Sequence, residues 1–446
     1  MWDKDVALRM LQYECSKDKN VLKRRKSMNA FDKIIGYSSI KKELETLVDM
    51  MTNADKYQKL GVKMPRGLLL YGDPGVGKTL MANCLIEASG RPCFTVRKDK
   101  ADGDFINEIK NTFNKAKEAA PSIVFLDDMD KFSDTDGRNC NEEEYVTVQA
   151  CMDDVKECDV FVIATANEDR SLPDSLVREG RLGRKVSVGN PQGQDAVEII
   201  RHFLAGKEFV EEVNAEDVAK MIGGSSCAVL ESCINEAGIY AGIQGKDKID
   251  TEDLKRGVLR ILFSAPESLD EIPENVIRAI AYHEAGHTII SEIYAPGSVG
   301  LVSVYAHDGP TRGITNYTAD DRYWDDKANL ENRVRTLLGG KAATELVYGK
   351  SDIGTSSDLS RAFRIVARFV DDYCAIAFDS YTIHDNSNDL LARKDSRVAH
   401  EMDRYYAEAK RIIADNRPFL DAVANALVEK KILVSSEIQE IKKSLN

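Results

Sequence analysis

Eight consecutive residues, the segment GDPGVGKT at 72–79, constrain the fold of this chain more than any other stretch. The segment matches the pattern G-x-x-x-x-G-K-[ST], follows the apolar run LLLY and precedes the helix-like stretch TLMANCLIEA. In that setting, the glycines let backbone N–H groups face phosphates at the N-terminus of a helix. We therefore predict a phosphate-binding loop between a strand and a helix, formed by Gly72, Asp73, Pro74, Gly75, Val76, Gly77, Lys78 and Thr79.

The residues around this loop predict where ATP and Mg²⁺ bind. Lys78 would reach the β- and γ-phosphates, and Thr79 would ligate Mg²⁺. The apolar segment SIVFL is followed by Asp127, whose carboxylate can hold the hydration shell of Mg²⁺, and by Asp128, which would activate the attacking water. A second apolar segment, VFVIATA, is followed by Asn167, an amide placed to orient that water.

The arrangement of apolar segments predicts the fold class. The runs RGLLLYG, PCFTVR, SIVFLDD and VFVIATAN are candidates for buried strands, and helix-like stretches separate them. This alternation is typical of a parallel sheet with helices on both faces. The motif NPQG interrupts the pattern at residues 190–193, and several short amphipathic helices follow up to about Leu262. A linker, SAPESLDEIP, then leads into a mostly helical region that ends at Asn446.

Composition excludes several classes of protein. A net charge of −13 argues against binding to nucleic acid, which requires clustered Lys and Arg. The nine cysteines include no C-x-x-C pair, as expected for reduced thiols in a reducing compartment. Because the chain has no apolar run of about 18 residues, no membrane span is expected in it. We predict a cytoplasmic protein, or a membrane-associated one if the chain is a fragment.

A second chemistry is indicated by the segment AYHEAGHTII at residues 281–290. It contains His283-Glu284-x-x-His287, and residues four apart lie on one face of a helix. In the pattern H-E-x-x-H the two histidines ligate zinc and the glutamate accepts a proton from water. An amphipathic helix with a satisfied histidine pair is the alternative. Two histidines are also insufficient, because a catalytic zinc site needs three protein ligands.

Together, these motifs resemble the AAA+ ATPase family, and their order resembles that of the FtsH-type ATP-dependent zinc metalloproteases. The similarity runs from about Phe31 into the C-terminal region. It is densest at FDKIIG, KLGVKMPRGLLLYGDPGVGKT, AAPSIVFLDDMD, NEAGIYA, AYHEAGH, LLGGKAATELVYG and TSSDLSRA. The resemblance implies an AAA+ α/β domain at 29–190 after a polar leader at 1–28. It also implies a helical lid at 191–263 (hereafter the lid segment) and a mostly α-helical zinc metallopeptidase domain at 264–446.

The resemblance also supplies functional residues that the motifs alone do not. The third zinc ligand of the family matches Asp358, in the segment GTSSDL, although Ser356 or Asp358 could instead cap the following helix. Arg181 and Arg184 occupy the positions of arginine fingers, which act on the γ-phosphate of a neighbouring subunit. The strand-like segments GLVSVYA and RGITNYT resemble the part of the family that binds the substrate backbone by β-addition.

Several departures from the family pattern affect the expected motor. The water-activating residue is Asp128 where the family has glutamate, and an intersubunit Asp-Gly-Phe segment is replaced by Asp153-Asp154-Val155. The loop KDKADGDF, residues 98–105, has no aromatic before Gly103, where the family has one that grips the substrate. Phe105 or a lysine stem could replace it. The membrane-spanning N-terminus of the family is not found in this sequence.

The sequence therefore predicts an ATP-dependent zinc metalloendopeptidase that acts on polypeptides as a ring, with a homohexamer expected. Zinc would be held by His283, His287 and Asp358, with Glu284 as the general base. One alternative is a zinc peptidase ring with a degenerate ATPase that binds ATP for assembly or gating. Another is a scaffold that only captures proteins, which the complete zinc motif disfavours.

Overall fold

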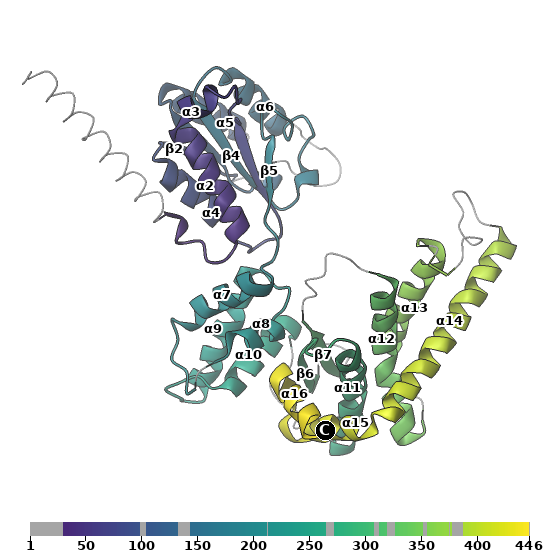
Figure 1. Cartoon of the computed structure of the whole chain (residues 1–446). Coiled ribbons are helices and arrows are strands. Elements are labelled where there is room, and N and C mark those ends of the chain that lie inside the picture. The colour runs from purple at the N-terminus through teal and green to yellow at the C-terminus, as the bar shows by residue number, and fades with distance from the viewer. Residues whose placement is uncertain are drawn as a thin grey trace, which may run out of the picture. The chain divides into compact units, whose positions relative to one another are not determined.

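A computed structural model describes residues 30–98, 104–132, 143–211, 213–264, 272–306, 312–318, 326–350, 355–373, 375–376 and 387–445. The chain divides into two compact units. The first takes residues up to Ile199 together with Ser226–Ala228, and the second takes the rest (Figure 1). The predicted leader at 1–28, most of the loop 98–105 and most of the linker after residue 263 lie outside the described residues. No helix in the described ranges has the length and apolar character needed to cross a bilayer.

The first unit is built around a parallel sheet with the strand order β2-β3-β4-β1-β5. The sheet contains the strands β1 (Gly67–Tyr71), β2 (Cys93–Val96), β3 (Ser122–Leu126), β4 (Val160–Ala166) and β5 (Arg184–Ser187). Every residue of β3 and β4 is buried, as expected for central strands covered on both faces. The four predicted strands are confirmed. The sequence did not predict the fifth strand, β5, which begins at Arg184 and lies at the edge of the sheet.

Helices cover both faces of this sheet (Figure 1). The connections β1–α4–β2 and β2–α5–β3 run along the sheet in opposite directions, so right-handed crossovers place α4 and α5 on opposite faces. On one face α4 packs on β1 and β4, with α2 against it, and on the other α5 packs on β2 and β3, with α6 against it. These helices are α2 (Ser38–Thr52), α4 (Lys78–Ser89), α5 (Phe105–Glu118) and α6 (Glu143–Asp154), and the short α3 (Ala54–Gln58) follows α2.

The lid segment is helical in the structure, as predicted. Its helices are α7 (Gly193–Leu204), α8 (Ala215–Met221), α9 (Cys227–Ile243) and α10 (Thr251–Phe263). The boundary between the compact units falls inside α7, and the start of α9 belongs to the first unit. There, the Ala228 N–H donates to the Gly75 carbonyl of the phosphate-binding loop, at 3.0 Å. The predicted three-domain division stays a prediction.

The C-terminal region combines long helices with a small antiparallel sheet in the order β7-β6-β8. The helices are α11 (Glu274–Tyr294), α12 (Lys327–Tyr348), α13 (Ser356–Asp371), α14 (Asn388–Asp415), α15 (Arg417–Lys430) and α16 (Ser435–Ser444). The strands are β6 (Val299–Ala306), β7 (Arg312–Tyr317) and β8 (Ile432–Val434). The region is mostly helical, as predicted, and the two strand-like segments do form the hairpin β6–β7.

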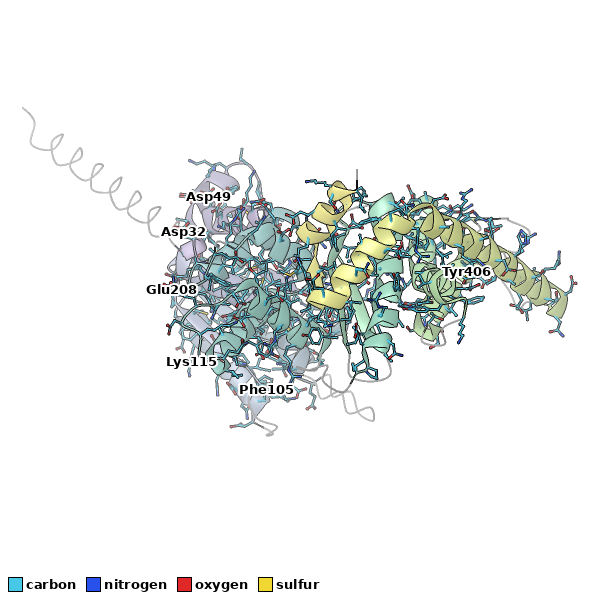
Figure 2. The ribbon with its side chains drawn as sticks, turned by 90° about the horizontal axis from the view of Figure 1, so that it is seen from below. Asp32, Asp49, Phe105, Lys115, Glu208 and Tyr406 are labelled. Carbon is cyan, nitrogen blue, oxygen red and sulfur yellow. The ribbon has the colours of Figure 1, made fainter. Side chains whose placement is uncertain are left out.

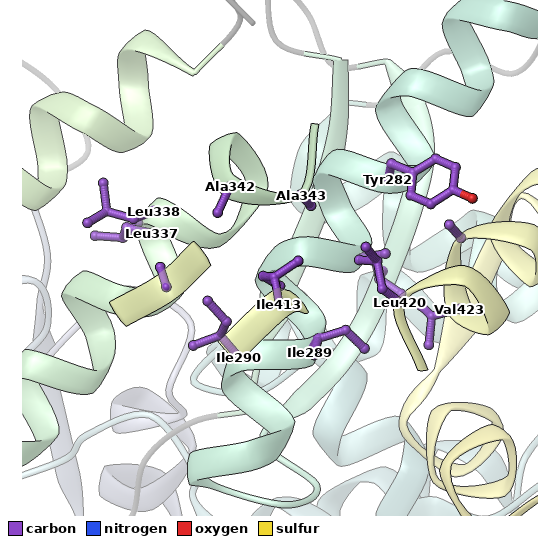
Figure 3. Close-up of a cluster of buried hydrophobic side chains, with 14 of the residues drawn as sticks. Tyr282, Ile289, Ile290, Leu337, Leu338, Ala342, Ala343, Ile413, Leu420 and Val423 are labelled. Atoms are coloured by element: carbon purple, nitrogen blue, oxygen red, sulfur yellow. The ribbon is translucent and has the colours of Figure 1, made fainter. Parts of the chain in front are cut away.

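Helix α11 is the centre of the apolar core of this region (Figure 3). Ile289 and Ile290 are fully buried on it, and side chains from α12, α14 and α15 surround them, including Leu338, Ile413 and Leu420. Burying an aliphatic side chain of this size contributes about 1.5–3 kcal/mol. The apolar core therefore fixes the axis and rotation of the helix that carries His283-Glu284-x-x-His287.

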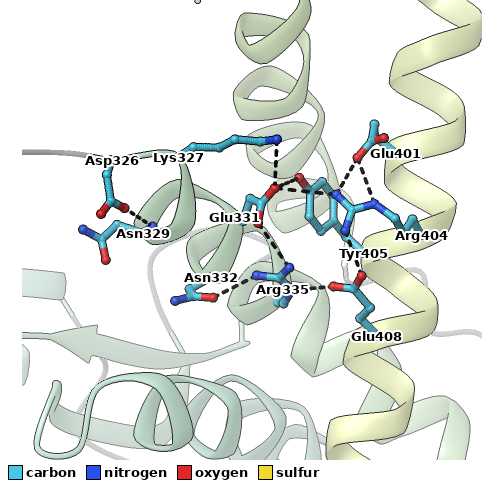
Figure 4. Close-up of polar contacts among 10 residues, drawn as sticks. All are labelled: Asp326, Lys327, Asn329, Glu331, Asn332, Arg335, Glu401, Arg404, Tyr405 and Glu408. Atoms are coloured by element: carbon cyan, nitrogen blue, oxygen red, sulfur yellow. Dashed lines mark hydrogen bonds and ion pairs between the residues drawn. The ribbon is translucent and has the colours of Figure 1, made fainter. Parts of the chain in front are cut away.

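A charged network fastens α14 to α12 at the edge of the core (Figure 4). Arg335 of α12 donates to Glu408 of α14 at 2.6 Å, and Arg404 donates to Glu408 at 2.8 Å. The hydroxyl of Tyr405, whose ring is fully buried, donates to Glu331 at 2.9 Å. Charges that share partners in this way form a network, which contributes more than isolated surface pairs. Further along the same helices, Tyr406 donates to Glu345.

Within the second unit the lid segment packs on the strands of the C-terminal region. The Asn316 amide of β7 donates to the carbonyl of Met221, the last residue of α8, at 2.7 Å. Gly300 of β6 lies so close to Lys220 that a side chain there would collide with the lysine carbonyl. Lys255 of α10 is buried and pairs with Glu437 of α16 at 3.1 Å. Hydrogen bonds and backbone packing thus join the two parts.

Candidate metal centre and nucleotide site

Three side chains that the sequence predicted as zinc ligands converge in the second unit. His283 Nε2 and His287 Nε2 lie 3.1 Å apart. Asp358 Oδ2 lies 3.4 Å from the first and 3.3 Å from the second. Tetrahedral zinc with bonds of about 2.0–2.1 Å places its ligand atoms about 3.3 Å apart. The spacing of the three atoms therefore fits one zinc ion, and a three-ligand set leaves a fourth position for water.

Local structure explains how these side chains meet. His283 and His287 lie one turn apart on α11, with ring centroids 4.7 Å apart. Asp358 lies in the first turn of α13, whose N-cap residue is Thr355, and no side-chain capping bond is formed there. Neither of the residues considered as a cap, Ser356 or Asp358, occupies that position. His287 Nδ1 lies 2.7 Å from the Thr336 carbonyl of α12, which fixes the ring and turns Nε2 toward Asp358.

A glycine contact between α11 and α12 makes room for the histidines. A Cβ on Gly340 would lie 2.6–2.7 Å from atoms of both imidazole rings, far inside van der Waals contact. Gly286 and Gly339 face each other backbone to backbone, and a side chain on either would collide with the other helix. Sequence reasoning missed these glycines. The pair GG inside the helical stretch LLGGKAATELVYG was the available signal, because glycine in a helix interior is unfavourable without such a contact.

Glu284, the predicted base, is 5% exposed and its carboxylate faces strand β7. The Thr315 hydroxyl donates to Glu284 Oε2 at 2.6 Å. A Cβ on Gly313, where φ is +88°, would lie 2.5 Å from Oε1. Burial raises the pKa of Glu284, and the nearby histidines and Thr315 oppose that shift. A raised carboxylate pKa lies closer to neutral pH, as general bases require. The sequence did not point to Thr315.

The protonation of the ligand set is shifted strongly in the metal-free chain. Burial alone would lower the pKa of His287, but the hydrogen bond and charge of Asp358 outweigh it and raise that pKa to about 9. Burial would raise the pKa of Asp358, but its hydrogen bonds to His283 and His287 outweigh that and lower it well below its usual value. The charges of His287 and Asp358 thus stabilise each other.

The predicted nucleotide residues lie at the carboxyl ends of β1, β3 and β4. Lys78 is buried, and its ammonium donates to the carbonyls of Gly72 and Asp73 at 2.7 and 2.9 Å and to Asn167 Oδ1 at 3.2 Å. Thr79 and Thr165 both donate to Asp127 Oδ1, at 3.1 and 2.9 Å. Lys78, Thr79, Asp127 and Asn167 are therefore assembled in one place, where open α/β sheets bind their ligands.

Asp128 and Asn167 have partners that the sequence did not predict. Asp128 has a left-handed backbone, with φ at 53°, and pairs with Lys131 at 2.7 Å. The Asp128 carboxylate therefore already has a cationic partner in its own chain. The Asn167 amide donates to Asp130 Oδ2 at 2.6 Å, which orients the amide oxygen toward Lys78. Asp130 stands two residues after Asp128 in the segment DDMD, and this proximity was the only available signal.

The two predicted arginine fingers differ in the structure. Arg181 is 4% exposed and binds Asp153 in its own chain through two bonds, at 2.7 and 3.1 Å, and the Ser175 carbonyl at 2.5 Å. Arg184 is exposed on the edge strand and pairs with Glu43 at 2.9 Å. An exposed pair of this kind contributes little to stability and separates easily. Of the two, only Arg184 has an accessible guanidinium in this conformation.

Comparisons with known proteins agree with the geometry of both sites. Residues 68–190 match the model of the ATPase family associated with various cellular activities (AAA), and residues 271–441 match that of peptidase family M41. "ATP-dependent zinc metalloprotease FtsH" of Synechococcus sp. (strain JA-2-3B'a(2-13)) is 30% identical, over 93% of this chain and 70% of the relative. FtsH 2 of Thermoanaerobacter sp. (strain X514) is 28% identical, over 94% of this chain and 83% of the relative.

This chain belongs to the FtsH family of ATP-dependent zinc metalloproteases. It is a hydrolase in which an ATPase and a zinc peptidase share one polypeptide, and its cofactors are ATP, Mg²⁺ and zinc. The resemblance inferred from the motifs is thus confirmed, as is the fold class. The roles of individual residues remain predictions.

The Gly340 contact predicts a loss of zinc affinity in this FtsH-family protein. Gly340→Ala places a methyl group against both imidazoles and moves them apart. Substitutions that misorient metal ligands lower affinity about 10- to 100-fold. Titration against a fluorescent zinc chelator measures this directly. Gly242→Ala, in helix α9 with nothing near the added methyl group, is the control and should keep its zinc. Equal affinities for all three proteins would contradict the prediction.

The shifted pKa of His287 predicts how pH affects stability once the metal is removed. Its pKa rises from 6.5 to about 9 on folding. The protonated form is therefore favoured in the folded state, and the added stability is complete below pH 6.5 and lost as pH rises to about 9. Chelator-treated protein should thus melt at progressively lower temperature between these values. His287→Gln should flatten this dependence, and an unchanged slope in that variant would contradict the assignment.

The two arginines should respond differently to removal. Arg184→Ala should leave the melting temperature unchanged and lower ATP hydrolysis about a thousandfold, as for other fingers. Arg181→Ala removes a buried side chain and leaves the Ser175 carbonyl without its donor, so it should cost about 1–3 kcal/mol of folding free energy. Thermal melts measure the loss of folding stability, and phosphate release measures the loss of ATP hydrolysis. Destabilisation by Arg184→Ala and none by Arg181→Ala would contradict these predictions.

Proposed function

We propose that this FtsH-family protein is an endopeptidase that degrades unfolded or loosely folded polypeptides as a homohexameric ring. The single observation that supports peptidase chemistry most strongly is the cluster of His283, His287 and Asp358, whose side-chain atoms lie at tetrahedral spacing. The buried Glu284 directly follows His283 in the chain. A structural histidine pair does not require a third ligand atom at 3.3–3.4 Å from both rings.

Each residue of the site has a defined task in peptide hydrolysis. His283, His287 and Asp358 would hold the zinc ion, with the Thr336 carbonyl fixing His287. Zinc, when bound, polarises the scissile carbonyl and lowers the pKa of the attacking water. Glu284 accepts a proton from that water, and the same carboxyl group then donates it to the amide nitrogen that leaves. Its buried, anchored carboxylate suits this exchange.

The small sheet offers a place for the substrate backbone. In the order β7-β6-β8, β7 is an edge strand, and it passes directly over Glu284. An extended polypeptide added to such an edge is bound through its main chain, largely independently of sequence. This mode suits a protease that must accept many unfolded segments. It also requires the substrate to be extended before it is cut.

We further propose that the ATPase of this ring pulls on substrates only weakly. Phe105, labelled in Figure 2, could have replaced the missing gripping aromatic. It is 4% exposed, begins α5 and packs edge-to-face on Phe132. Lys98 points inward as well, donating to the Phe132 carbonyl at 2.8 Å. Val155, at the intersubunit phenylalanine position, is buried in its own chain. None of these side chains is presented for contact with a substrate or a neighbour.

A degenerate ATPase that only assembles or gates the ring is the second candidate. It is favoured by Arg181, which is bound within its own chain, and by Asp128, which pairs with Lys131. It differs from a weak motor in one measurable respect. A weak motor hydrolyses ATP slowly and still accelerates the degradation of loose chains. A degenerate module binds ATP, and its effect on degradation does not require hydrolysis.

The peptidase proposal is tested by Glu284→Gln. The variant keeps the shape of the side chain and loses its ability to accept a proton, so cleavage of a short peptide should fall about 10²- to 10⁴-fold. Metal analysis should still find close to one zinc per chain. Wild-type protein that contains no zinc, or a variant that cleaves at the wild-type rate, would refute the proposal.

The weak-motor proposal is tested with two substrates. The protein should degrade casein with ATP and stall on a tagged, stably folded fluorescent domain. Basal ATP turnover should be slow, and Asp128→Glu should raise it about 10- to 100-fold, because the longer side chain returns the carboxylate to its working position. Phosphate release measures the turnover. Rapid ATP-driven loss of fluorescence from the folded domain would rule out a weak motor.

A further inference from the structure

The contacts of strand β7 assign a role to a residue that no motif identifies. We infer that Thr315 is a positioning residue for the general base: its hydroxyl holds one oxygen of Glu284 so that the other is aimed at the attacking water. This inference rests on the proposed role of Glu284 and adds a further residue to that reaction.

The geometry of the hydrogen bond supports this role. Thr315 Oγ1 lies 2.6 Å from Glu284 Oε2, a distance typical of a hydroxyl bonded to a carboxylate. The Thr315 hydroxyl also lies 3.4 Å from the Glu284 carbonyl, the longer of its two contacts with this residue. That carbonyl has a closer donor, because the Thr288 hydroxyl donates to it at 2.9 Å. A glutamate side chain rotates about three bonds, and a buried one without a partner can adopt more than one direction. The Thr315 bond selects one.

The other oxygen of Glu284 lies against the same strand, at a glycine. Residues i and i+2 of a strand share a face, so Gly313 and Thr315 both face α11. At Gly313 a Cβ would lie 2.5 Å from Glu284 Oε1. Any residue larger than glycine would collide with that oxygen. A glycine inside a strand often marks such a close approach. The strand therefore binds Oε2 through Thr315 and meets Oε1 only with the bare backbone of Gly313.

A threonine with a purely structural role would be expected to have a different hydrogen-bond partner. Threonine suits strands in any case, and its Cβ branch packs well on a pleated surface. Strand packing, however, does not require a hydroxyl bonded to the one carboxylate beside the metal ligands. The next threonine along the chain shows the contrast: the Thr318 hydroxyl donates to the Ser298 carbonyl at 3.3 Å, a bond within the hairpin. Thr318 thus provides a matched control.

The test compares three variants of the full chain, each loaded with zinc. Thr315→Val keeps the branched shape and loses the hydroxyl, so kcat for a short peptide should fall about 10- to 100-fold, as for a misplacement of about 1 Å. KM and bound zinc should stay at wild-type values. Thr315→Ser retains the hydroxyl and should restore kcat to within about threefold of wild type. Thr318→Val should leave kcat unchanged. Equal losses in the Val and Ser variants at position 315, or a loss confined to KM or zinc, would overturn the inference.

A second measurement does not depend on activity. In metal-free protein, Thr315→Val should lower the melting temperature when Glu284 is present and change it little in a Glu284→Ala background, because the lost bond needs both partners. The same decrease in both backgrounds would overturn the inference. If the wild-type protein lacks zinc-dependent peptidase activity, the proposed function fails on that ground. The comparison of melting temperatures in the two backgrounds then still shows whether Thr315 and Glu284 interact.

Discussion

Direct backbone contact between α11 and α12 is the constraint on which the peptidase region depends. Gly286 and Gly339 let the two helices approach without side chains between them. This approach brings the Thr336 carbonyl to His287 and places the Gly340 backbone against both imidazole rings. Glycine in a helix interior costs about 1 kcal/mol per residue relative to alanine. The surrounding aliphatic core offsets that cost many times over, so the helices can be packed this tightly without losing the fold.

The same principle organises the nucleotide site, with strands in place of helices. The fully buried strands β3 and β4 are followed directly by Asp127 and Asn167, and the loop after β1 leads to Lys78. Parallel strands that are held in register carry their last residues to one edge of the sheet. Lys78 and Asn167 are thus neighbours, although 88 intervening residues separate them in the chain. In both regions an apolar interior fixes the positions of a few polar atoms.

Features encoded locally could be predicted from the sequence, and those that depend on distant contacts could not. Loop glycines, buried apolar runs and the histidine spacing on α11 follow from local rules, and Asp358 required family resemblance. The edge strand β5 was missed because RKVS has only one buried residue, and β8 because it is three residues long. Thr315, Gly340 and the Arg181–Asp153 pair depend on which surfaces meet. A local pattern can at most hint at such a contact, as the pair GG in α12 does, without identifying the surface that it meets.

The bond between Asn316 and Met221 bears on how this protein can be dissected. It joins α8 of the lid segment to β7, and the packing of Gly300 on Lys220 closes the same seam. A fragment that starts after α10 would expose the Asn316 amide and the bare backbone at Gly300, and would remove Lys255, the buried partner of Glu437. The exposed surface includes strand β6, whose neighbour β7 anchors Glu284. A fragment that keeps this contact surface covered must therefore include α8 and α10 of the lid segment, well upstream of His283.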